Sequence, residues 1–430
     1  MTVEARRRSS AGMLALILLI GCYLAPRFWA QSHPALDTSV PAISLPRSGI
    51  HPAGRAGIAH AGSAPPTALQ GSWLAAGRIP EVPELGGSTM VQDALRDLET
   101  LSLPYGVPVA GWAPAWRYVW PRDSAFAASA LARTGHIADA RRILNFLSAA
   151  QPASGGFQAR YRPDGSGPPD GRGVQLDGSG WAAWALDQVA SQLPSDGDRR
   201  RLVADFGSLL DGSVDAIFVA IGDGSSLPPA SADYWETPER RVTLATCSVL
   251  LAGLRSAERL YGVAGDPRQA VLRLVGDRFE QTVLAAFAAD GFPRHVGGPA
   301  RSVDLGVTFM MSPFAGTRDR AALDAWRRSP SFMRRPAGGL APGGSWRRDG
   351  ISWTPTVATY AMASACQASR PEAVNWLRWL DQHRTAAGSL PEKVLANGQP
   401  ASVAPLAWTA AAVVITADEL ERGCAEDAAR

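Results

Sequence analysis

Hydrophobic residues recur along most of the chain at the i, i+3, i+4, i+7 spacing of an amphipathic helix. A short stripe is formed by Ala140, Ile143, Leu144 and Leu147, and residues 242–261 carry a longer one. Similar stripes lie at residues 181–188, 202–210, 272–283, 357–361, 374–380 and 406–417. No segment shows five or more residues of clean alternation, which disfavours a strand-rich domain. We therefore predict an all-α protein of about ten to twelve helices, each roughly 10–20 residues long.

The connections between these helices differ greatly in length. Gly135-His136 marks a tight link, whereas residues 154–173, 222–232 and 336–350 are long and rich in Gly and Pro. A simple helix bundle does not need such loops. A ring of helical hairpins uses them, with the long loops gathered around a cleft at one end. Long loops in a compact domain usually carry function.

The N-terminus has the pattern of an export signal. Three arginines at positions 6–8 precede an apolar run at residues 13–24, which is too short to span a bilayer comfortably. Residues 19–22 (Leu-Ile-Gly-Cys) resemble a bacterial lipobox, in which the cysteine, here Cys22, becomes lipid-modified. An uncleaved signal anchor and ordinary secretion are the alternatives. Each of them places the rest of the chain outside the cytoplasm, with membrane contact only through the N-terminus.

Composition changes again after this signal. Residues 31–87 are rich in Pro, Ala, Gly and Ser, carry few charges and show no sustained periodicity, as expected of a flexible linker. We therefore expect three parts: a signal or anchor at 1–30, a linker at 31–87 and one folded domain at 88–425.

The overall composition excludes several function classes. The 430 residues are 46% hydrophobic and 19% charged, which is globular, and the net charge of +3 gives no reason to expect nucleic acid binding. Four Cys and six His show no metal-binding spacing, so we expect no metal and no cofactor. One disulfide among Cys247, Cys366 and Cys424 would suit an exported protein. We expect a monomer.

Several predicted loops place a carboxylate beside an aromatic residue. These pairs lie around Trp120 and Asp123, Asp177 and Trp181, Trp235 and Glu236, Trp346 and Asp349, and Glu392 and Trp408. Sugars suit this mixture, because their C–H faces pack on aromatic rings while their hydroxyls need Asp and Arg partners. The alternative is that the Trp residues fill a core and the acidic residues cap helices.

Four of these segments together resemble the glucoamylase-type glycoside hydrolases (glycoside hydrolase family 15). Residues 117–123 (Arg-Tyr-Val-Trp-Pro-Arg-Asp) and 175–181 (Gln-Leu-Asp-Gly-Ser-Gly-Trp) are similar to the first two signatures of the family. Residues 233–236 (Asp-Tyr-Trp-Glu) are similar to the loop of the general acid, and residues 389–394, with 405–408 after them, to the loop of the general base. The resemblance implies an (α/α)6 barrel and hydrolysis of α-glucosidic linkages from a non-reducing end, with inversion.

The resemblance also implies roles for single residues. Glu236 would be the acid that protonates the departing oxygen, with Trp235 excluding water around it, and Glu392 would be the base that activates water. Inverting enzymes keep these two carboxyl groups roughly 6.5–9.5 Å apart. The substrate-binding candidates are Trp120, Arg122, Asp123, Asp177, Trp235 and Arg348. The expected partner is an oligosaccharide or polysaccharide.

The sequence also departs from the family pattern. Thr237 stands where a second acidic residue is common, Arg240-Arg241 stands where aromatic residues are usual, and residues 346–349 match only loosely. The domain is short, and the β-sandwich found before it in many bacterial members is absent. Two other hypotheses therefore stay open: a non-catalytic glycan-binding surface protein, and an (α/α)-barrel enzyme that acts on another polysaccharide.

Overall fold

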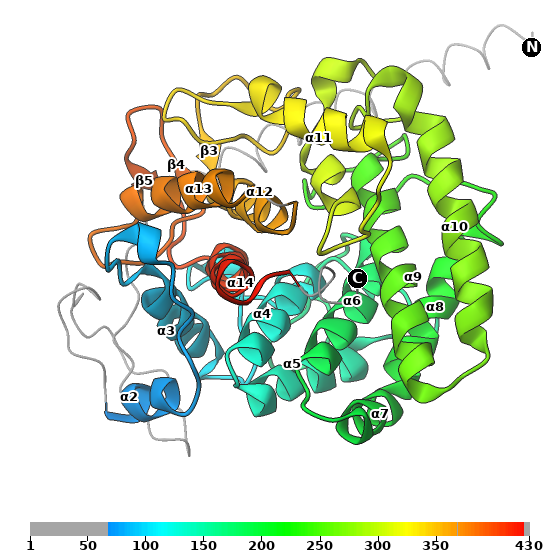
Figure 1. Ribbon diagram of the computed structural model, residues 1–430, viewed down its shortest axis with the longest axis horizontal. Helices are drawn as coiled ribbons and strands as arrows, with labels where there is room; N and C mark the ends of the chain where they lie inside the picture. Colours follow the sequence, from blue (N-terminus) through cyan, green and yellow to red (C-terminus); the bar gives the residue numbers. More distant parts are fainter. Residues whose placement is uncertain (1–67, 368, 425–430) are drawn as a thin grey trace, which may run out of the picture.

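The computed structural model describes residues 68–367 and 369–424, and the regular structure within them is mainly helical (Figure 1). The α-helices are α2 (Ala68–Ala75), α3 (Met90–Ser102), α4 (Pro121–Arg133), α5 (Ile137–Ala150), α6 (Asp177–Ser191), α7 (Asp196–Asp205), α8 (Gly207–Ile221), α9 (Leu244–Ala264), α10 (Arg268–Phe287), α11 (Arg320–Met333), α12 (Thr354–Cys366), α13 (Arg370–Gln382) and α14 (Ala407–Arg422). Eleven of these thirteen helices are 10–20 residues long, which confirms the helical prediction.

The helices form two concentric rings, as Figure 1 shows. Neighbouring members of the inner ring pack against one another in the order α4, α6, α9, η5, α12 and α14, and α14 closes the ring on α4. The outer helices α3, α5, α8, α10, α11 and α13 pack against this ring. Every residue of α4 is buried, because it is covered on all sides. This arrangement is the expected (α/α)6 barrel.

One member of the inner ring is not an α-helix. Between α10 and α11 the inner position is taken by η5 (Leu305–Met310), a 3-10 helix of six fully buried residues. The other 3-10 helices are η1 (Pro83–Leu85), η2 (Pro114–Trp116), η3 (Ala288–Asp290) and η4 (Ala300–Ser302). The barrel is therefore complete in its packing but irregular at its fourth hairpin, which α10 and η5 form.

The strands within the described residues are two residues long and lie in the loops. Strands β1 (Phe157–Gln158) and β2 (Val174–Gln175) pair antiparallel. Strand β4 (Lys393–Val394) pairs antiparallel with both β3 (Ser352–Trp353) and β5 (Pro400–Ala401). The β1–β2 hairpin fixes the base of the long loop predicted at residues 154–173.

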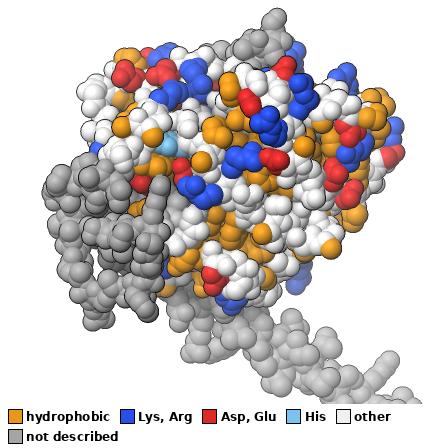
Figure 2. Space-filling view, turned by 90° about the horizontal axis from the view of Figure 1, so that it is seen from below, with side chains coloured by type: hydrophobic (Ala, Val, Ile, Leu, Met, Phe, Trp, Pro, Cys, Tyr) orange, Lys and Arg blue, Asp and Glu red, His pale blue; other side chains and the backbone are white. Residues whose placement is uncertain are grey.

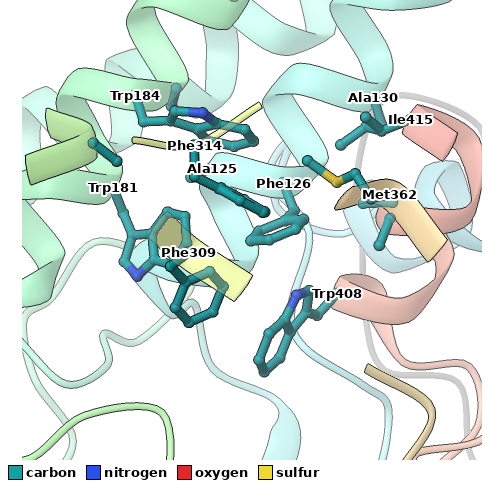
Figure 3. Packing of buried hydrophobic residues seen from close by; sticks show 14 of the residues in the cluster. Ala125, Phe126, Ala130, Trp181, Trp184, Phe309, Phe314, Met362, Trp408 and Ile415 are labelled. Atoms are coloured by element: carbon teal, nitrogen blue, oxygen red, sulfur yellow. The ribbon is translucent and has the colours of Figure 1, made fainter. Parts of the chain in front are cut away.

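Aromatic side chains fill the centre of the barrel (Figure 3). The ring of Phe126 lies 5.4 Å from those of Trp181 and Trp184 and 5.7 Å from that of Trp408, measured between centroids. Trp184 donates its indole N–H to the carbonyl of Pro313, at 2.8 Å. For Trp181 and Trp184 the interpretation as core residues is therefore correct.

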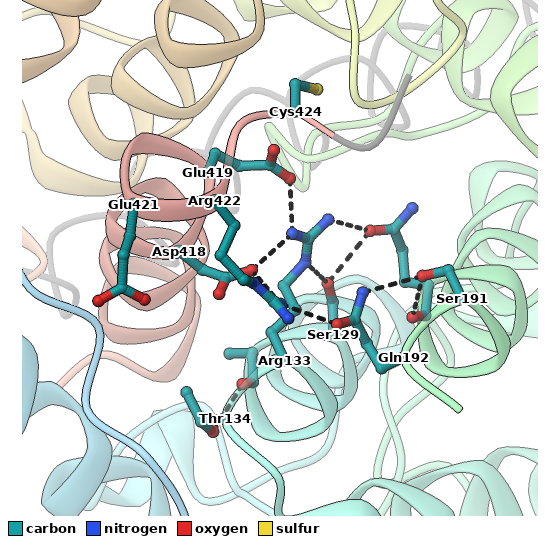
Figure 4. Close-up of polar contacts among 12 residues, drawn as sticks. Ser129, Arg133, Thr134, Ser191, Gln192, Asp418, Glu419, Glu421, Arg422 and Cys424 are labelled. Carbon is teal, nitrogen blue, oxygen red and sulfur yellow. Dashed lines mark hydrogen bonds and ion pairs between the residues drawn. The ribbon is translucent and has the colours of Figure 1, made fainter. Parts of the chain in front are cut away.

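The inner helices α4, α6 and α14 end together at one end of the barrel. There the guanidinium of Arg133 binds Asp418 at 2.9 Å, Glu419 at 2.6 Å and Gln188 at 2.8 Å (Figure 4). A buried guanidinium needs this many acceptors, because an unpaired charge in the interior is costly. The network fastens three helices at this end and leaves their N-terminal ends for the site.

A disulfide lies at the same end. Cys366, the last residue of α12, is bonded to Cys424, just after α14, with 5.1 Å between the Cα atoms. Glu419 approaches both sulfur atoms closely enough for a shared metal, but those sulfurs are bonded to each other. Cys247 is buried and has a free thiol.

Residues 68–87 pack against the barrel, which differs from the expected linker at 31–87. Trp73 of α2 stacks on His136 with 3.7 Å between the ring centroids, and it donates a hydrogen bond to Asp139 at 3.1 Å. Arg78 pairs with Asp418 and Glu421. The aromatic stack and these ion pairs hold the segment in place. Within the described residues, the folded domain therefore begins at residue 68 and not at residue 88.

The expected signal at 1–30, Cys22 and the first part of the expected linker lie outside the described residues. Among residues 68–424, apart from 368, no helix is long and apolar enough to cross a bilayer. On the face shown in Figure 2, basic and acidic side chains alternate among hydrophobic ones. That face therefore has no continuous basic patch of the kind that binds nucleic acid.

Candidate active site

The site lies where the inner helices begin. Arg122 and Asp123 stand in the first turn of α4, and both are buried, with exposed fractions of 9% and 3%. The Nη2 of Arg122 binds the Oδ2 of Asp123 at 2.9 Å, and the guanidinium carbon lies 4.3 Å from the ring centroid of Trp408, in the first turn of α14. The first turns of α4 and α14 thus hold the Arg122–Asp123 ion pair against the ring of Trp408.

Glu236 reaches this pair from the loop before α9. Its Oε1 lies 3.7 Å from the Nη1 of Arg122, and its Oε2 accepts a hydrogen bond from the Nη1 of Arg172 at 2.9 Å. Its backbone is left-handed, with φ +56°. Such strain in a non-glycine residue persists only where the surroundings impose it, and it is typical of functional sites. Since α9 begins only at Leu244, with Thr243 as its N-cap, the helix-capping alternative is wrong for Glu236.

A buried charge network fixes the backbone of this loop. Asp233 accepts hydrogen bonds from the amides of Trp235, at 3.0 Å to its side chain, and of Glu236, at 2.8 Å to its carbonyl. Arg294, only 1% exposed, binds Asp233 at 2.8 Å and Asp304 at 2.6 Å. Its guanidinium carbon lies 3.8 Å from the ring centroid of Trp235. Arg294 therefore holds Asp233 and Trp235, and through them the loop that carries Glu236.

Glu392 lies on the loop before β4, close enough to Asp123 for its charge to act on that carboxyl group. Its Oε2 accepts a hydrogen bond from the Oγ of Ser402 at 2.5 Å and lies 3.3 Å from the Nζ of Lys393. The Nε1 of Trp116 donates to its Oε1 at 3.3 Å. Three donors thus orient one carboxylate.

A chain of aromatic rings joins the two loops. Trp235, beside Glu236, contacts Trp346 edge-on with 4.6 Å between centroids, and Trp346 contacts Trp353 in the same way at 5.3 Å. The Nζ of Lys393, beside Glu392, lies 4.3 Å from the ring centroid of Trp353. The structure thus connects the two predicted catalytic loops through side chains that pack together.

Asp177 stands at the start of α6, behind Arg122. Its Oδ2 accepts a hydrogen bond from the indole of Trp181 at 3.3 Å. Burial, with smaller contributions from the nearby carboxylates of Asp233 and Glu236, raises the pKa of Asp177 to about 7, while Arg122 opposes the rise. Asp177 is therefore a carboxyl group that can hold a proton near neutral pH.

Burial also raises the pKa of Glu236, although its side chain stays 21% exposed. Arg122 and Arg172 oppose this rise, because a positive neighbour favours the ionised form. Burial likewise raises the pKa of Asp123, against the charge of Arg122. Burial and the neighbouring cations thus act on the pKa of each of these two carboxyl groups in opposite directions.

Several buried donors in this region have no hydrogen-bond partner among the described residues. They are the indole N–H groups of Trp112, Trp120, Trp235, Trp353 and Trp408 and the Nε of Arg122. Buried polar groups in proteins are normally paired, so such a cluster is unusual.

The structure brings most of the predicted site residues together, namely Trp120, Arg122, Asp123, Asp177, Trp235, Glu236 and Glu392. Trp120 is buried beside Tyr118, with 6.3 Å between the ring centroids. Arg348 is exposed, and no contact described for residues 68–424 joins it to either glutamate or to Arg122.

Sequence reasoning missed Arg172, Arg294, Ser402 and Trp116 as parts of the site. Trp116 had a signal, since it belongs to the Trp-rich segment before Arg122. The other three lie in segments with no motif of their own. Only the folded chain shows that they surround the carboxyl groups.

No protein-family model and no curated protein matches the chain. Solved structures do match it. A glycosidase solved in complex with glucose is 20% identical, with a TM-score of 0.67, over 79% of this chain and 98% of that one. A bacterial glucoamylase complexed with acarbose is 15% identical, with a TM-score of 0.64, over 83% of this chain and 58% of that one.

The glucoamylase from Saccharomycopsis fibuligera is 14% identical, with a TM-score of 0.61, over 82% of this chain and 95% of its own. These similarities extend over most of the described domain and agree with the closed double ring of helices. The chain therefore has the (α/α)6-barrel fold of the glucoamylases and of the glycosidases similar to them.

Proposed function

We propose that the protein is a glycoside hydrolase that cleaves α-glucosidic linkages from the non-reducing end with inversion. The observation that carries this proposal is the pair of glutamates on two separate loops, each in a different environment. Glu236 is largely buried and has a raised pKa, whereas Glu392 is oriented by three donors. Two carboxyl groups with separate surroundings are what acid and base roles require.

In the proposed reaction, Glu236 donates its proton to the glycosidic oxygen as the bond to the sugar breaks. Glu392 takes a proton from the water that attacks the anomeric carbon from the other face. The attacking water supplies the new hydroxyl, so the configuration at that carbon inverts. Trp116, Ser402 and Lys393 keep Glu392 directed at that water.

The proposed substrate is a saccharide. The unpartnered indole N–H groups and the Nε of Arg122 can donate to hydroxyls, and the rings beside them suit sugar C–H faces. Arg122 and Asp123 would grip the terminal sugar and fix its position relative to Glu236. Two of the matching structures contain a saccharide ligand, glucose or acarbose, which supports the same class.

Glu236→Gln and Glu392→Gln test the proposal. Each substitution removes a proton-transfer group, so we expect glucose release from maltooligosaccharides, dextran or trehalose to fall at least about 100-fold. NMR of the first product should show β-glucose. Glu84→Gln is the control, because Glu84 only pairs with Arg370 at the surface.

Near-normal activity in either variant would show that the assigned roles are wrong. If the wild-type protein binds α-glucans but releases no glucose, the protein is a glycan-binding protein of this fold. A shift in ultraviolet absorbance on uronate polysaccharides would instead indicate a lyase or a related enzyme.

We also propose that the protein is exported and anchored at the membrane by its N-terminus. The basic and apolar start of the chain supports this, and so does the Cys366–Cys424 disulfide, since disulfides persist in oxidising compartments. Fractionation of cells that express the full chain tests the proposal.

A further inference from the structure

A row of charged residues leads from the loop between β1 and β2 to Glu236. The Nη1 of Arg172 binds the Oε2 of Glu236 at 2.9 Å, and its Nε lies 3.2 Å from the Oδ2 of Asp170. Asp170 is held in turn by the Nη2 of Arg160 at 2.5 Å. The guanidinium carbon of Arg160 lies 4.2 Å from the ring centroid of Tyr118. Arg172 thus connects the candidate acid to a second carboxylate.

This ion pair conflicts with the role of an acid. A general acid must carry a proton, whereas a guanidinium at hydrogen-bond distance favours the ionised carboxylate. Arg172 binds Oε2 of Glu236, and the Nη1 of Arg122 stands 3.7 Å from Oε1. In this arrangement both oxygens face cations, so Glu236 is not ready to protonate a glycosidic oxygen.

Of the two arginines, Arg172 is the one that is free to move. Arg122 is buried, bound to Asp123 and packed on Trp408. Arg172 lies within an exposed stretch, residues 170–174, and its side chain is 37% exposed. The next residue, Gly173, has φ +87°, a conformation that suits glycine. Exposed segments with few buried contacts open most easily.

We propose that Arg172 is a positioning residue that keeps Glu236 ionised in the free protein and is displaced when a saccharide binds, so that Glu236 becomes an acid only with substrate in place. When Arg172 moves away from Glu236, its ion pair with Asp170 is kept. This inference rests on the proposed function. The other groups that face Glu236 are Arg122 from α4, Asp177 from α6, Gln175 from β2 and Asp233 from its own loop; no step of the inference alters these four groups.

The direction of the expected effect follows from the charges. Burial raises the pKa of Glu236, and Arg172 is one of the two cations that oppose the rise. Removing Arg172 therefore raises this pKa further in the free protein. An acid loses activity as the pH rises through its pKa, so the alkaline limb of the kcat/KM profile should move to higher pH.

The test compares Arg172→Gln with the wild type in pH profiles of maltotriose hydrolysis. We expect the alkaline limb of kcat/KM, which reports the free enzyme, to move up by roughly one pH unit. The alkaline limb of kcat, which reports the complex, should stay in place. Arg172→Lys should restore the wild-type limb, because it keeps the charge. Arg162→Gln is the control, since Arg162 lies in the same loop but binds the carbonyl of Pro168 at 2.9 Å.

Two results would overturn the inference. One is an unmoved kcat/KM limb in Arg172→Gln. The other is an equal shift of both limbs, which would mean that Arg172 stays paired in the complex.

A ¹³C NMR titration of the glutamate carboxyl groups separates this inference from the proposed function. The signal of Glu236 is identified by its loss in Glu236→Gln, and its pKa should be higher in Arg172→Gln. If the wild type releases no glucose, the proposed function fails, and this titration still decides the role of Arg172. An unchanged pKa of Glu236 in Arg172→Gln would then refute it.

Discussion

At the scale of single residues, the surroundings of each carboxyl group decide its behaviour. Glu236 and Asp177 share Arg122, yet Asp177 is fully enclosed and Glu236 keeps a partly open side with Arg172. Glu392 has hydroxyl, indole and ammonium donors instead. The sequence pointed to these carboxylates through their motifs, but it could not reveal which cations stand beside them.

Asp97 of α3 should make stability depend on pH. The Oγ of Ser389 donates to its Oδ1 at 3.0 Å, while its buried Oδ2 has no partner among the described residues. Burial raises its pKa to about 8, far above the value of about 3.9 in an unfolded chain. The folded protein therefore holds an extra proton between these pH values, so stability falls as pH rises from about 4 to 8, by up to about 1.4 kcal/mol per pH unit.

Asp97→Asn removes this dependence. In urea unfolding, the free energy of the variant should rise relative to that of the wild type between pH 5 and pH 8. Asp215→Asn, an exposed position on α8, should leave the dependence unchanged. A constant difference between Asp97→Asn and the wild type at both pH values would contradict the expected titration.

At the scale of elements, helical periodicity was a reliable guide and its exceptions are instructive. The stripe at residues 242–261 became α9, a helix of 21 residues. A Cβ at Gly253 would lie 2.6 Å from the Cα of Gly180, so glycines let α9 approach α6 closely. The fourth inner element, η5, has no helical stripe, because all of its residues are buried. Helix α2 was missed, since its apolar residues lie in a Pro- and Gly-rich stretch.

The disulfide fastens two elements, so its loss should lower stability. Cys366 and Cys424 are 58 positions apart, and closing such a loop contributes on the order of 4 kcal/mol in the chain-entropy account. We expect Cys366→Ser with Cys424→Ser to reduce the free energy of unfolding in urea by an amount of this order. Reducing agent should weaken the wild type similarly and leave the double variant unaffected. A wild type indifferent to reducing agent would contradict the prediction.

At the scale of the whole molecule, the side chains that fasten the inner helices lie at one end of the barrel and the candidate site lies at the other. The inner helices α4, α6 and α14 end in the Arg133 network and begin at the site. The long loops can therefore vary without loosening the barrel. This separation accounts for how the fold persists at 14–20% identity to its structural neighbours.

The expected anchor makes a prediction at the same scale. If Cys22 carries lipid, the full chain should fractionate with membranes, and Cys22→Ser should abolish lipid attachment. Membrane fractionation and labelling with a radioactive fatty acid measure both effects. Membrane retention of Cys22→Ser without any label would favour an uncleaved anchor, and a wild-type chain confined to the cytoplasm would contradict export.

The sequence by itself determined the class of fold, and it indicated Glu236, Glu392, Arg122 and Asp123 as the candidate site residues. Periodicity and short motifs are local properties, so they can be read along the chain. Only the tertiary structure decided which side chains meet. Arg172 lies 64 positions before Glu236, and Trp116 lies 276 positions before Glu392. Such pairs depend on how six hairpins close into a ring, which no local pattern encodes.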